Sequence, residues 1–453
     1  MLRSAAIQAA RRSRVLVAGA TLLTAATVSH GAQAGYQVSV GVIESDNIQR
    51  LPSGGDANTI IEEEIGLTWH QRGSRLDADV DADLSHLNYV PAIFGPEVIG
   101  NFIGQARYSI VPQALFWDLA DNFGQSSIDP LQAITPANRE FVNYAMTGPE
   151  MLLPIGGSTL LDVAARYGRV DYQTSALNSN RYSGRLGVIH NLSPLSHVSL
   201  NVRDERVNYT NDTVSPDYDN QEAFVRFDAK GFRTTIDADL GVARLRQPGT
   251  SPSTVLAHLD LTRRITPSNT LALSFGHEFS DSAASFRVEQ SLGGANLNAQ
   301  TVSSSGTPFT SQYGSLAWNF ARNRTSWGLT ASLYKDHYLQ GGSLNDQRTE
   351  IDAHLSRQMT PTVQLSLFEV FQKQKFENVV GNSTQTTTDV RLTWRMGSRV
   401  SMFVDYAHAT RSSDLPASDF KENRIWLSIG YGRPAETPAG PPTPNLPRAA
   451  IYN

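Results

Sequence analysis

The sequence predicts an all-β protein, specifically a transmembrane antiparallel up-and-down β-barrel of about 20 strands, within a range of about 18–22. Three observations support this fold class. Apolar and polar residues alternate along most of the chain, and the alternating segments are long. The connections between them are, in turn, tight turns and long polar connectors. Alternation with a period of two is typical of a strand whose two faces meet different surroundings. Hydrocarbon on one face and water on the other is what a membrane barrel with a wet interior requires.

The clearest alternation lies at residues 76–84, which read Leu-Asp-Ala-Asp-Val-Asp-Ala-Asp-Leu. In a strand, the apolar side chains of this segment point to one face. Asp77, Asp79, Asp81 and Asp83 then point to the other face. A helix would scatter the four aspartates around its axis. Similar alternation marks residues 234–242, 255–261, 271–279 and 400–406.

Two kinds of connector alternate along the chain. Tight turns rich in Gly, Pro, Asn and Ser, which set turn geometry, are centred near residues 73, 112, 156, 195, 231, 267, 324, 360 and 397. Longer polar connectors cover residues 44–58, 89–97, 126–140, 174–179, 211–218, 247–252, 281–310, 339–345, 377–383 and 412–419. These connections imply about 20 strands, with the tight turns on the periplasmic side. The connector at 281–310 either folds inward as a constriction or stays outside, and its composition is compatible with both.

The two ends of the chain are expected to lie outside the barrel. Residues 1–34 combine an arginine-rich start, a weakly apolar run and a small-x-small site at Ala32-Gln33-Ala34, which predicts a signal peptide cleaved after Ala34. Residues 35–433 form the predicted barrel. Residues 434–453 contain six prolines and no periodicity, which indicates a flexible tail. The expected location is the outer membrane of a Gram-negative bacterium.

The amino-acid composition limits the kinds of functional site that the chain can carry. The chain has 453 residues, no cysteine, 18% charged residues and a formal net charge of -5. Disulfides and thiolate metal sites are therefore excluded, and a nucleic-acid-binding surface, which needs a basic excess, is not expected. We expect no metal and no cofactor.

One cluster is a candidate functional site. Glu62 and Glu64 precede a tight turn, so their strand is expected to pair with the strand that carries the four aspartates. We call the set the acidic strip: Glu62, Glu64, Asp77, Asp79, Asp81 and Asp83. The strip either attracts cations in a pore or is a solvated interior wall balanced by lumen arginines such as Arg226, Arg264 and Arg391. The second interpretation is favoured, because like charges placed opposite each other repel.

Catalysis is not predicted. The pairs His277-Glu278 and Asp336-His337 lie on expected strands, and no Gly-x-Ser-x-Gly follows a strand and opens a helix. We therefore expect no catalytic residues. The alternating segments begin near Tyr36, so no plug domain of the kind found in large energy-coupled importers is expected ahead of the barrel.

Several segments resemble a known family. Residues 39–48 read Ser-Val-Gly-Val-Ile-Glu-Ser-Asp-Asn-Ile, and Phe116-Trp117-Asp118 is followed by Ser127-Ile128-Asp129-Pro130. Together with the aspartate strand, these segments resemble a family of outer-membrane β-barrels of porin type that are found with exopolysaccharide and PEP-CTERM/exosortase gene clusters. The resemblance implies a pore or scaffold linked to export or assembly of surface exopolysaccharide. The implied partners are polysaccharide or export-system components.

Two further partners follow from the barrel itself, namely outer-membrane lipid and the barrel-insertion machinery, whose terminal signal resembles residues 424–431. Aromatic residues gather towards strand ends, as a girdle at the lipid headgroups would: Trp69, Tyr108, Trp117, Tyr167, Phe279, Trp318, Trp327, Tyr334, Trp394, Trp426 and Tyr431.

Four alternatives remain. A general diffusion porin has the same architecture, and a structural or adhesive surface protein would have a packed lumen without transport. An enzyme at the barrel rim would need a Ser/His or Asp/His pair within hydrogen-bond reach. A soluble, secreted all-β protein is disfavoured by the strand length and the two-sided alternation.

Overall fold

The computed structural model describes residues 32–433, apart from residues 212, 214, 292–303, 341 and 343. The predicted signal peptide, except for its last three residues, and the predicted tail at 434–453 lie outside the described residues. The strands are β1 (Ala32–Ser45), β2 (Asn58–Arg72), β3 (Leu76–Val90), β4 (Glu97–Val111), β5 (Leu115–Ser127), β6 (Arg139–Pro154), β7 (Thr159–Tyr172), β8 (Ser179–Ser193), β9 (Ser196–Tyr209), β10 (Tyr218–Lys230), β11 (Thr234–Arg246), β12 (Ser253–Thr266), β13 (Asn269–Ser280), β14 (Phe309–Arg322), β15 (Thr325–Tyr338), β16 (Asp346–Gln358), β17 (Val363–Phe376), β18 (Ser383–Arg395), β19 (Val400–Ser413) and β20 (Phe420–Arg433).

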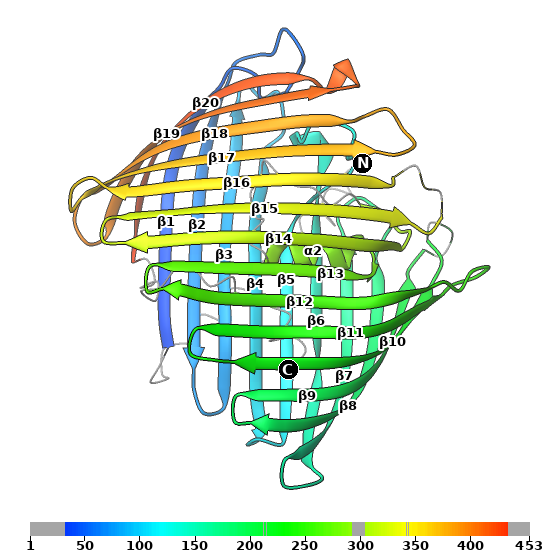
Figure 1. Ribbon diagram of the computed structural model, residues 1–453. Coiled ribbons are helices and arrows are strands. Elements are labelled where there is room, and N and C mark those ends of the chain that lie inside the picture. Colours follow the sequence, from blue (N-terminus) through cyan, green and yellow to red (C-terminus); the bar gives the residue numbers. More distant parts are fainter. Residues whose placement is uncertain are drawn as a thin grey trace, which may run out of the picture.

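These strands close into one barrel (Figure 1). Each strand pairs antiparallel with its neighbour in sequence, and β1 pairs with β20 from Tyr36 opposite Arg433 to Ser45 opposite Arg424. The result is a 20-stranded antiparallel sheet without a free edge. The predicted fold class and strand count are confirmed. β1 begins at Ala32, so the last residues of the predicted signal segment pair with β2.

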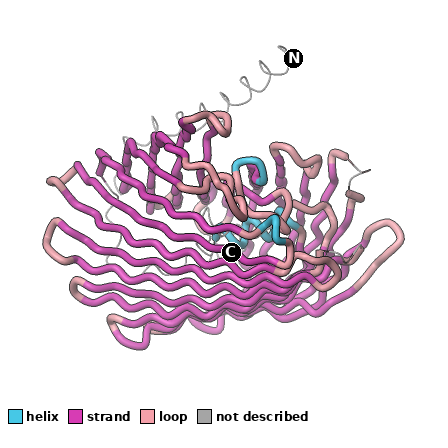
Figure 2. The backbone as a smooth tube through the Cα atoms, turned by 90° about the horizontal axis from the view of Figure 1, so that it is seen from above, coloured by secondary structure: helices cyan, strands magenta, loops and turns pink. Residues whose placement is uncertain are grey.

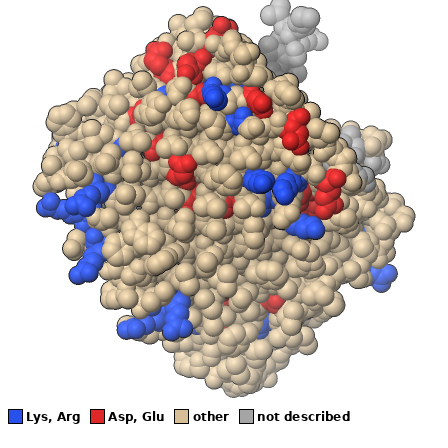
Figure 3. All heavy atoms as spheres, turned by 45° about the horizontal axis from the view of Figure 1, so that its top comes forward, with Lys and Arg blue, Asp and Glu red and all other residues tan. Residues whose placement is uncertain are grey.

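The strands have two chemically different faces. The outward face carries an apolar band, with exposed side chains such as Val40, Ile65, Leu200, Val242 and Leu427. Figure 3 shows this as a broad surface with few charges, with Lys, Arg, Asp and Glu gathered mainly beyond it. No water is available in hydrocarbon to satisfy backbone groups, so a closed sheet with an apolar exterior suits a bilayer.

Three of the residues predicted for the aromatic girdle face the inside of the barrel instead, so the prediction was wrong for them. Trp426 lies opposite Asp405, and Tyr334 lies opposite Arg348, all on the inner face. Phe279 is buried in an inward cluster with Tyr209 and Leu245. The alternation of faces explains Trp426, because its neighbours Ile425 and Leu427 are the outward residues.

The observed strands extend further than the alternation predicted. The segment expected at 234–242 continues to Arg246, and that expected at 400–406 continues to Ser413. Above the apolar band the outward face is also polar, as at Arg244 and Arg246, so the two faces no longer differ in sequence. The alternation disappears there although the strand pairing continues.

Two long connectors fold into the barrel instead of standing clear of it (Figure 2). The β5–β6 connector carries the short 3-10 helix η2 (Pro136–Asn138), and the β13–β14 connector carries the helix α2 (Ser282–Ser291). A second 3-10 helix, η3 (Pro416–Ser418), lies in the β19–β20 connector. We call residues 128–138 and the described residues of 281–308 the two mouth loops. They lie at the end with the long connectors, which is the extracellular end of such barrels.

No helix among the described residues is both long and apolar enough to cross a membrane.

Candidate functional site: the lumen

The acidic strip lies on the inner face of β2 and β3. Register pairs Glu64 with Ser85, and places His70 opposite Asp79 and Arg72 opposite Asp77. Leu87 and Tyr89, which share a face with the aspartates, are buried inside the barrel with Ile60 and Ile99. All six strip residues therefore lie on the inner face of the barrel.

The lower end of the strip is paired with cations. The Arg72 guanidinium lies 2.6 Å from Asp77 and 2.7 Å from Asp79. His70 Nδ1 lies 2.9 Å from the Asp79 carboxylate. These contacts neutralise part of the charge beside the periplasmic turn.

The upper part of the strip has fewer cationic partners among the described residues. Ser39 Oγ donates a hydrogen bond of 2.8 Å to Glu64. Asp81 and Asp83 are exposed inside the barrel, and no ion pair of the described residues involves either of them. Exposed carboxylates on an inward face require water, so this side of the lumen is wet.

The predicted counter-charges are only partly where they were expected. Arg391 on β18 lies close enough to act electrostatically on Glu62, while its Nε lies 2.7 Å from Asp405. Arg226 lies on β10 and pairs with Asp239, far round the wall from the strip. Arg264 lies near the periplasmic end of β12. Of the three arginines, only Arg391 acts on the strip.

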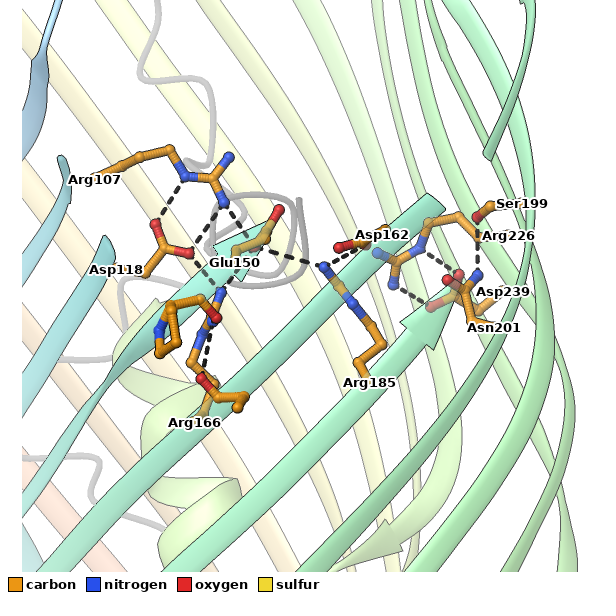
Figure 4. A network of polar contacts seen from close by, with 12 residues as sticks. Arg107, Asp118, Glu150, Asp162, Arg166, Arg185, Ser199, Asn201, Arg226 and Asp239 are labelled. Carbon is orange, nitrogen blue, oxygen red and sulfur yellow. Dashed lines mark hydrogen bonds and ion pairs between the residues drawn. The ribbon is translucent and has the colours of Figure 1, made fainter. Parts of the chain in front are cut away.

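A buried ion-pair network lies on the inner wall from β4 onwards, directly beside the strip, since Arg107 is paired with Asp77 in the strand register (Figure 4). Arg107 Nε lies 2.8 Å from Asp118, and its Nη2 lies 2.9 Å from Glu150. Arg166 contacts the same two carboxylates at 2.5 and 2.7 Å. The Glu150 side chain is only 1% exposed. Alternating partners of both signs let these charges be buried together.

The network continues round the barrel. Arg185 lies 2.7 Å from Asp162, and Arg226 makes two contacts of 2.7 Å with Asp239. These side chains are nearly inaccessible to solvent, so the inner wall formed by β7 to β11 is packed at this level. Sequence reasoning missed this network, because each of its residues is an ordinary charged position until the strand register is known.

One group of possible metal ligands occurs among the described residues. Ligand atoms of Asp237, Asp239 and His258 lie within 4.8 Å of one another. The Arg226 guanidinium already binds Asp239, and His258 Nε2 lies 2.8 Å from Asp260. These contacts supply the counter-charge, so the group is explained as part of the network.

The first mouth loop is anchored to the wall formed by β1, β19 and β20. Arg50 Nη1 donates a hydrogen bond of 2.7 Å to the Ile134 carbonyl, and its Nε lies 3.0 Å from Glu422. Arg411 and Ser418 each donate a hydrogen bond of 3.1 Å to the Leu131 carbonyl. This loop leaves β5 and reaches the far wall, so it crosses the mouth.

The second mouth loop is held by a buried carboxylate. Asp281 pairs with Arg181, accepts a hydrogen bond of 2.7 Å from Tyr218 and accepts one of 2.9 Å from the Ala284 N–H. Burial alone would raise the pKa of Asp281, but the charge of Arg181 and these hydrogen bonds hold it below its ordinary value. The carboxylate therefore stays ionised and fixes the start of α2, whose Phe286 packs with Val142 and Tyr144.

The second mouth loop also contacts β5, the strand from which the first mouth loop starts. Ser304 N–H donates a hydrogen bond of 3.1 Å to the Ser127 carbonyl, at the start of the first loop. Gln290 Nε2 donates one of 3.1 Å to the Phe123 carbonyl on β5. The described parts of the two loops therefore meet at β5 near the extracellular mouth.

The two histidine pairs considered from sequence are separated by the wall. On β15, Asp336 faces inward and accepts a hydrogen bond of 2.7 Å from Ser311. His337, the next residue, faces outward opposite Thr310. His277 likewise faces outward, opposite Ala257, whereas Glu278 lines an inner cavity. Neither pair acts as a unit.

Comparison with known proteins gives a partial family match. Residues 299–431 match the model of the family described as "Putative beta-barrel porin 2". This segment covers β14 to β19 and most of β20. No curated protein matches the chain.

Solved structures with a similar course of the chain include transporters and porins. The FrpB iron transporter from Neisseria meningitidis (F5-1 variant) aligns at 7% identity over 88% of this chain and 82% of its own, with a TM-score of 0.44. The ferric enterobactin receptor PfeA from Pseudomonas aeruginosa (R480A, Q482A mutant) aligns at 9% over 89% and 81%, with a TM-score of 0.47. OpdQ from Pseudomonas aeruginosa aligns at 9% over 89% and 100%, with a TM-score of 0.35. The strand pairing itself establishes the present barrel as one of outer-membrane type, and its C-terminal third resembles a porin family.

Proposed function

We propose that this barrel is a gated conduit for hydrophilic solutes, linked to the export or assembly of surface exopolysaccharide in a Gram-negative outer membrane. The observation that carries the proposal is the asymmetric lumen. The inner wall from β4 to β11 carries the buried ion-pair network, whereas the neighbouring β3 carries exposed inward carboxylates at Asp81 and Asp83. A wet, polar stretch of inner wall suits passage of a hydrated solute, whereas a purely structural barrel would have a packed lumen.

Gating is supported by the cover over the mouth. A general diffusion porin needs a permanently open bore, but here two loops cross from opposite walls and are held by Arg50 and Asp281. Both anchors are side-chain contacts that can be released without unfolding a strand. This observation favours a controlled conduit over the diffusion porin, which remains the second candidate because it shares the acidic lumen.

The link to exopolysaccharide is supported by the resemblance of residues 39–48 and 127–130 to the exopolysaccharide-associated barrels, and by the partial porin-family match. A neutral polymer with many hydroxyl groups would be compatible with a lumen rich in acceptors. Neighbouring genes for glycosyltransferases and an exosortase would add further support.

The test is conductance in a planar lipid bilayer, comparing the wild-type protein with a variant in which residues 130–136 are replaced by a short Gly-Ser linker. A gated conduit gives a low or intermittent current in the wild type and a larger, steady current in the variant. A large steady current in both proteins would identify a diffusion porin. No current in either protein would contradict the conduit and favour a structural role.

A deletion strain tests the polysaccharide link. Loss of cell-surface polysaccharide, measured with a labelled lectin and restored by the wild-type gene, is expected. Unchanged surface polysaccharide would separate the pore from this export role.

A further inference from the structure

A cavity lies in the lumen beneath the mouth loops. It has a volume of about 40 Å³ and is lined by aromatic and acidic side chains of β13 to β17, including Tyr313, Tyr334, Phe376 and Asp336. Pro130 of the first mouth loop and Ser285 of α2 form its cover. This space admits only a few water molecules, so a sugar ring would enter it only if the loops above it moved.

An arginine packs against the aromatic rings that line this cavity. Arg348 Cζ lies 4.2 Å from the centroid of Tyr334, and the ring centroids of Tyr334 and Tyr313 are 6.5 Å apart. Arg348 is only 3% exposed. The rings are therefore held in place before any ligand arrives, which lowers the entropic cost of binding.

A second aromatic side chain lies deeper along the same wall. Phe368 on β17 pairs with His354 and Asp389 on its two neighbouring strands, and all three face inward. It is nevertheless 40% exposed. The other exposed large apolar residues of the described strands face lipid or lie at strand ends, so Phe368 presents a phenyl ring to a wet passage.

A third aromatic group lies on β19 and β20. The rings of Phe403 and Trp426 meet edge to face with centroids 4.6 Å apart, and Arg391 Cζ lies 4.5 Å from the Phe403 centroid. Trp426 lies against Gly41, where an added Cβ would come within 2.6 Å of the indole nitrogen. Asp405 holds Arg391 in place at 2.7 Å. An arginine thus fixes the rings here as well.

The three aromatic groups follow one wall, from the mouth to the lower lumen, and carboxylates accompany each group. Asp336 lies beside the cavity, Asp389 opposite Phe368, and Asp405 beside Arg391. Sugar rings offer apolar C–H faces that pack on aromatic rings and hydroxyls that donate to carboxylates. The acidic strip beside this wall repels anions and tolerates neutral or positively charged groups.

We infer that this wall is a binding track for a glycan chain without acidic groups, built from neutral or amine-bearing sugars. The chain packs its rings on Phe403 and Trp426, then on Phe368, and ends in the cavity under Pro130 and α2. Occupancy of the cavity presses on both mouth loops, so the glycan itself favours their release. This inference rests on the proposed conduit and names its substrate class.

The test is isothermal titration calorimetry on the detergent-solubilised barrel with three hexasaccharides of different charge: cellohexaose, a chitosan hexamer and hexagalacturonate. The neutral and amine-bearing chains are expected to bind at least about tenfold more tightly than the acidic one. F368A is expected to weaken their binding about tenfold, because a stacking face is lost while the fold loses little packing. Y334F, which keeps the ring but removes the hydroxyl, is expected to weaken it less than F368A.

The matched control is F371A, which removes a phenyl ring from the outward face of the same strand. It should leave glycan binding unchanged. The inference is overturned if none of the three chains binds the wild type, if the acidic chain binds most tightly, or if F368A binds like F371A. Bilayer conductance of the same samples separates the two proposals. Current without glycan binding removes the track and keeps the conduit, whereas binding without current removes the conduit and keeps the track.

Discussion

Single side chains in the lumen carry separable roles, because the register places neighbouring residues on opposite sides of the wall. Glu62 and Glu64 lie on the inner face, where Glu62 is buried, while Glu63 between them faces outward and lies 3.5 Å from His86. Asp81 and Asp83 make no ion pair among the described residues, whereas Asp77 and Asp79 pair with Arg72. The strip is therefore expected to act on ions chiefly through Asp81 and Asp83.

The variant D81N/D83N is expected to lower the cation-to-anion permeability ratio about two- to threefold, because two negative charges leave the wet wall. Reversal potentials in a salt gradient measure this ratio. D77N should change it less, since Arg72 already neutralises Asp77. E63Q is the matched control on the outer face, and an equal shift in E63Q would contradict a role for the inward charges.

The buried network depends on each of its arginines. R166A leaves Asp118 and Glu150 with fewer cationic partners inside a dry region, and we expect the free energy of unfolding to fall by about 2–3 kcal/mol. Urea unfolding from detergent or vesicles measures the change. R206A removes an exposed contact of 4.0 Å with Asp219 and should cost no more than about 1 kcal/mol. Similar losses in both variants would show that the network adds no special stability.

At the scale of elements, the helix α2 is a short segment placed by contacts outside itself. It has ten residues, and its sequence has no strong apolar face. Isolated helices of this length are marginal in water. Its position depends on Asp281 meeting Arg181, a residue 100 positions earlier in the chain. We call this Asp281–Arg181 ion pair the latch. It determines whether the second mouth loop stays inside the barrel.

D281N is expected to release α2 and raise the open fraction in bilayer recordings about tenfold, since Arg181 is left buried without its carboxylate. Limited proteolysis of the connector should accelerate in parallel. D171N, which alters an exposed contact with Arg169, is the control. An open fraction equal to that of the wild type would show that the latch does not hold the loop.

The same latch sets an expected pH dependence. Because the folded pKa of Asp281 is lowered, its stabilising contribution is full above the ordinary carboxyl pKa of about 4 and is lost only as the pH falls through the lowered value. Conductance controlled by this latch should therefore stay constant between about pH 5 and 8. Opening within that range would point to a different titrating group.

Sequence reasoning was most successful with the strands and least successful with the mouth. The alternation at residues 76–84 was sufficient to place the acidic strip on one inner face, because period two is a local property. The inward course of the connector at 281–310 depends on Arg181, Tyr218 and Phe123, which no local pattern links to it. The cavity and the aromatic wall likewise exist only through the register, which brings residues of β13 to β20 together.

At the scale of the whole molecule, the apolar band around the barrel determines its behaviour in solution. We expect the purified protein to need detergent or lipid, and to migrate as a compact species on unheated SDS gels but as an extended one after boiling. Sedimentation with and without detergent checks the first expectation. A monodisperse protein in plain buffer would contradict membrane insertion, because the exposed Val, Leu and Ile side chains would then lack a lipid cover.

The pairing of β1 with β20 has a consequence for biogenesis. The first strand to be exported finds one of its two partners only in the last, almost 400 residues later, so its unpaired hydrogen-bonding edge must be shielded while the rest of the chain arrives. We expect such a polypeptide to depend on periplasmic holding chaperones for the whole of its passage. Loss of the final fourteen-residue strand should leave two complementary edges exposed at once, and the product is expected to aggregate or be degraded before any membrane receives it.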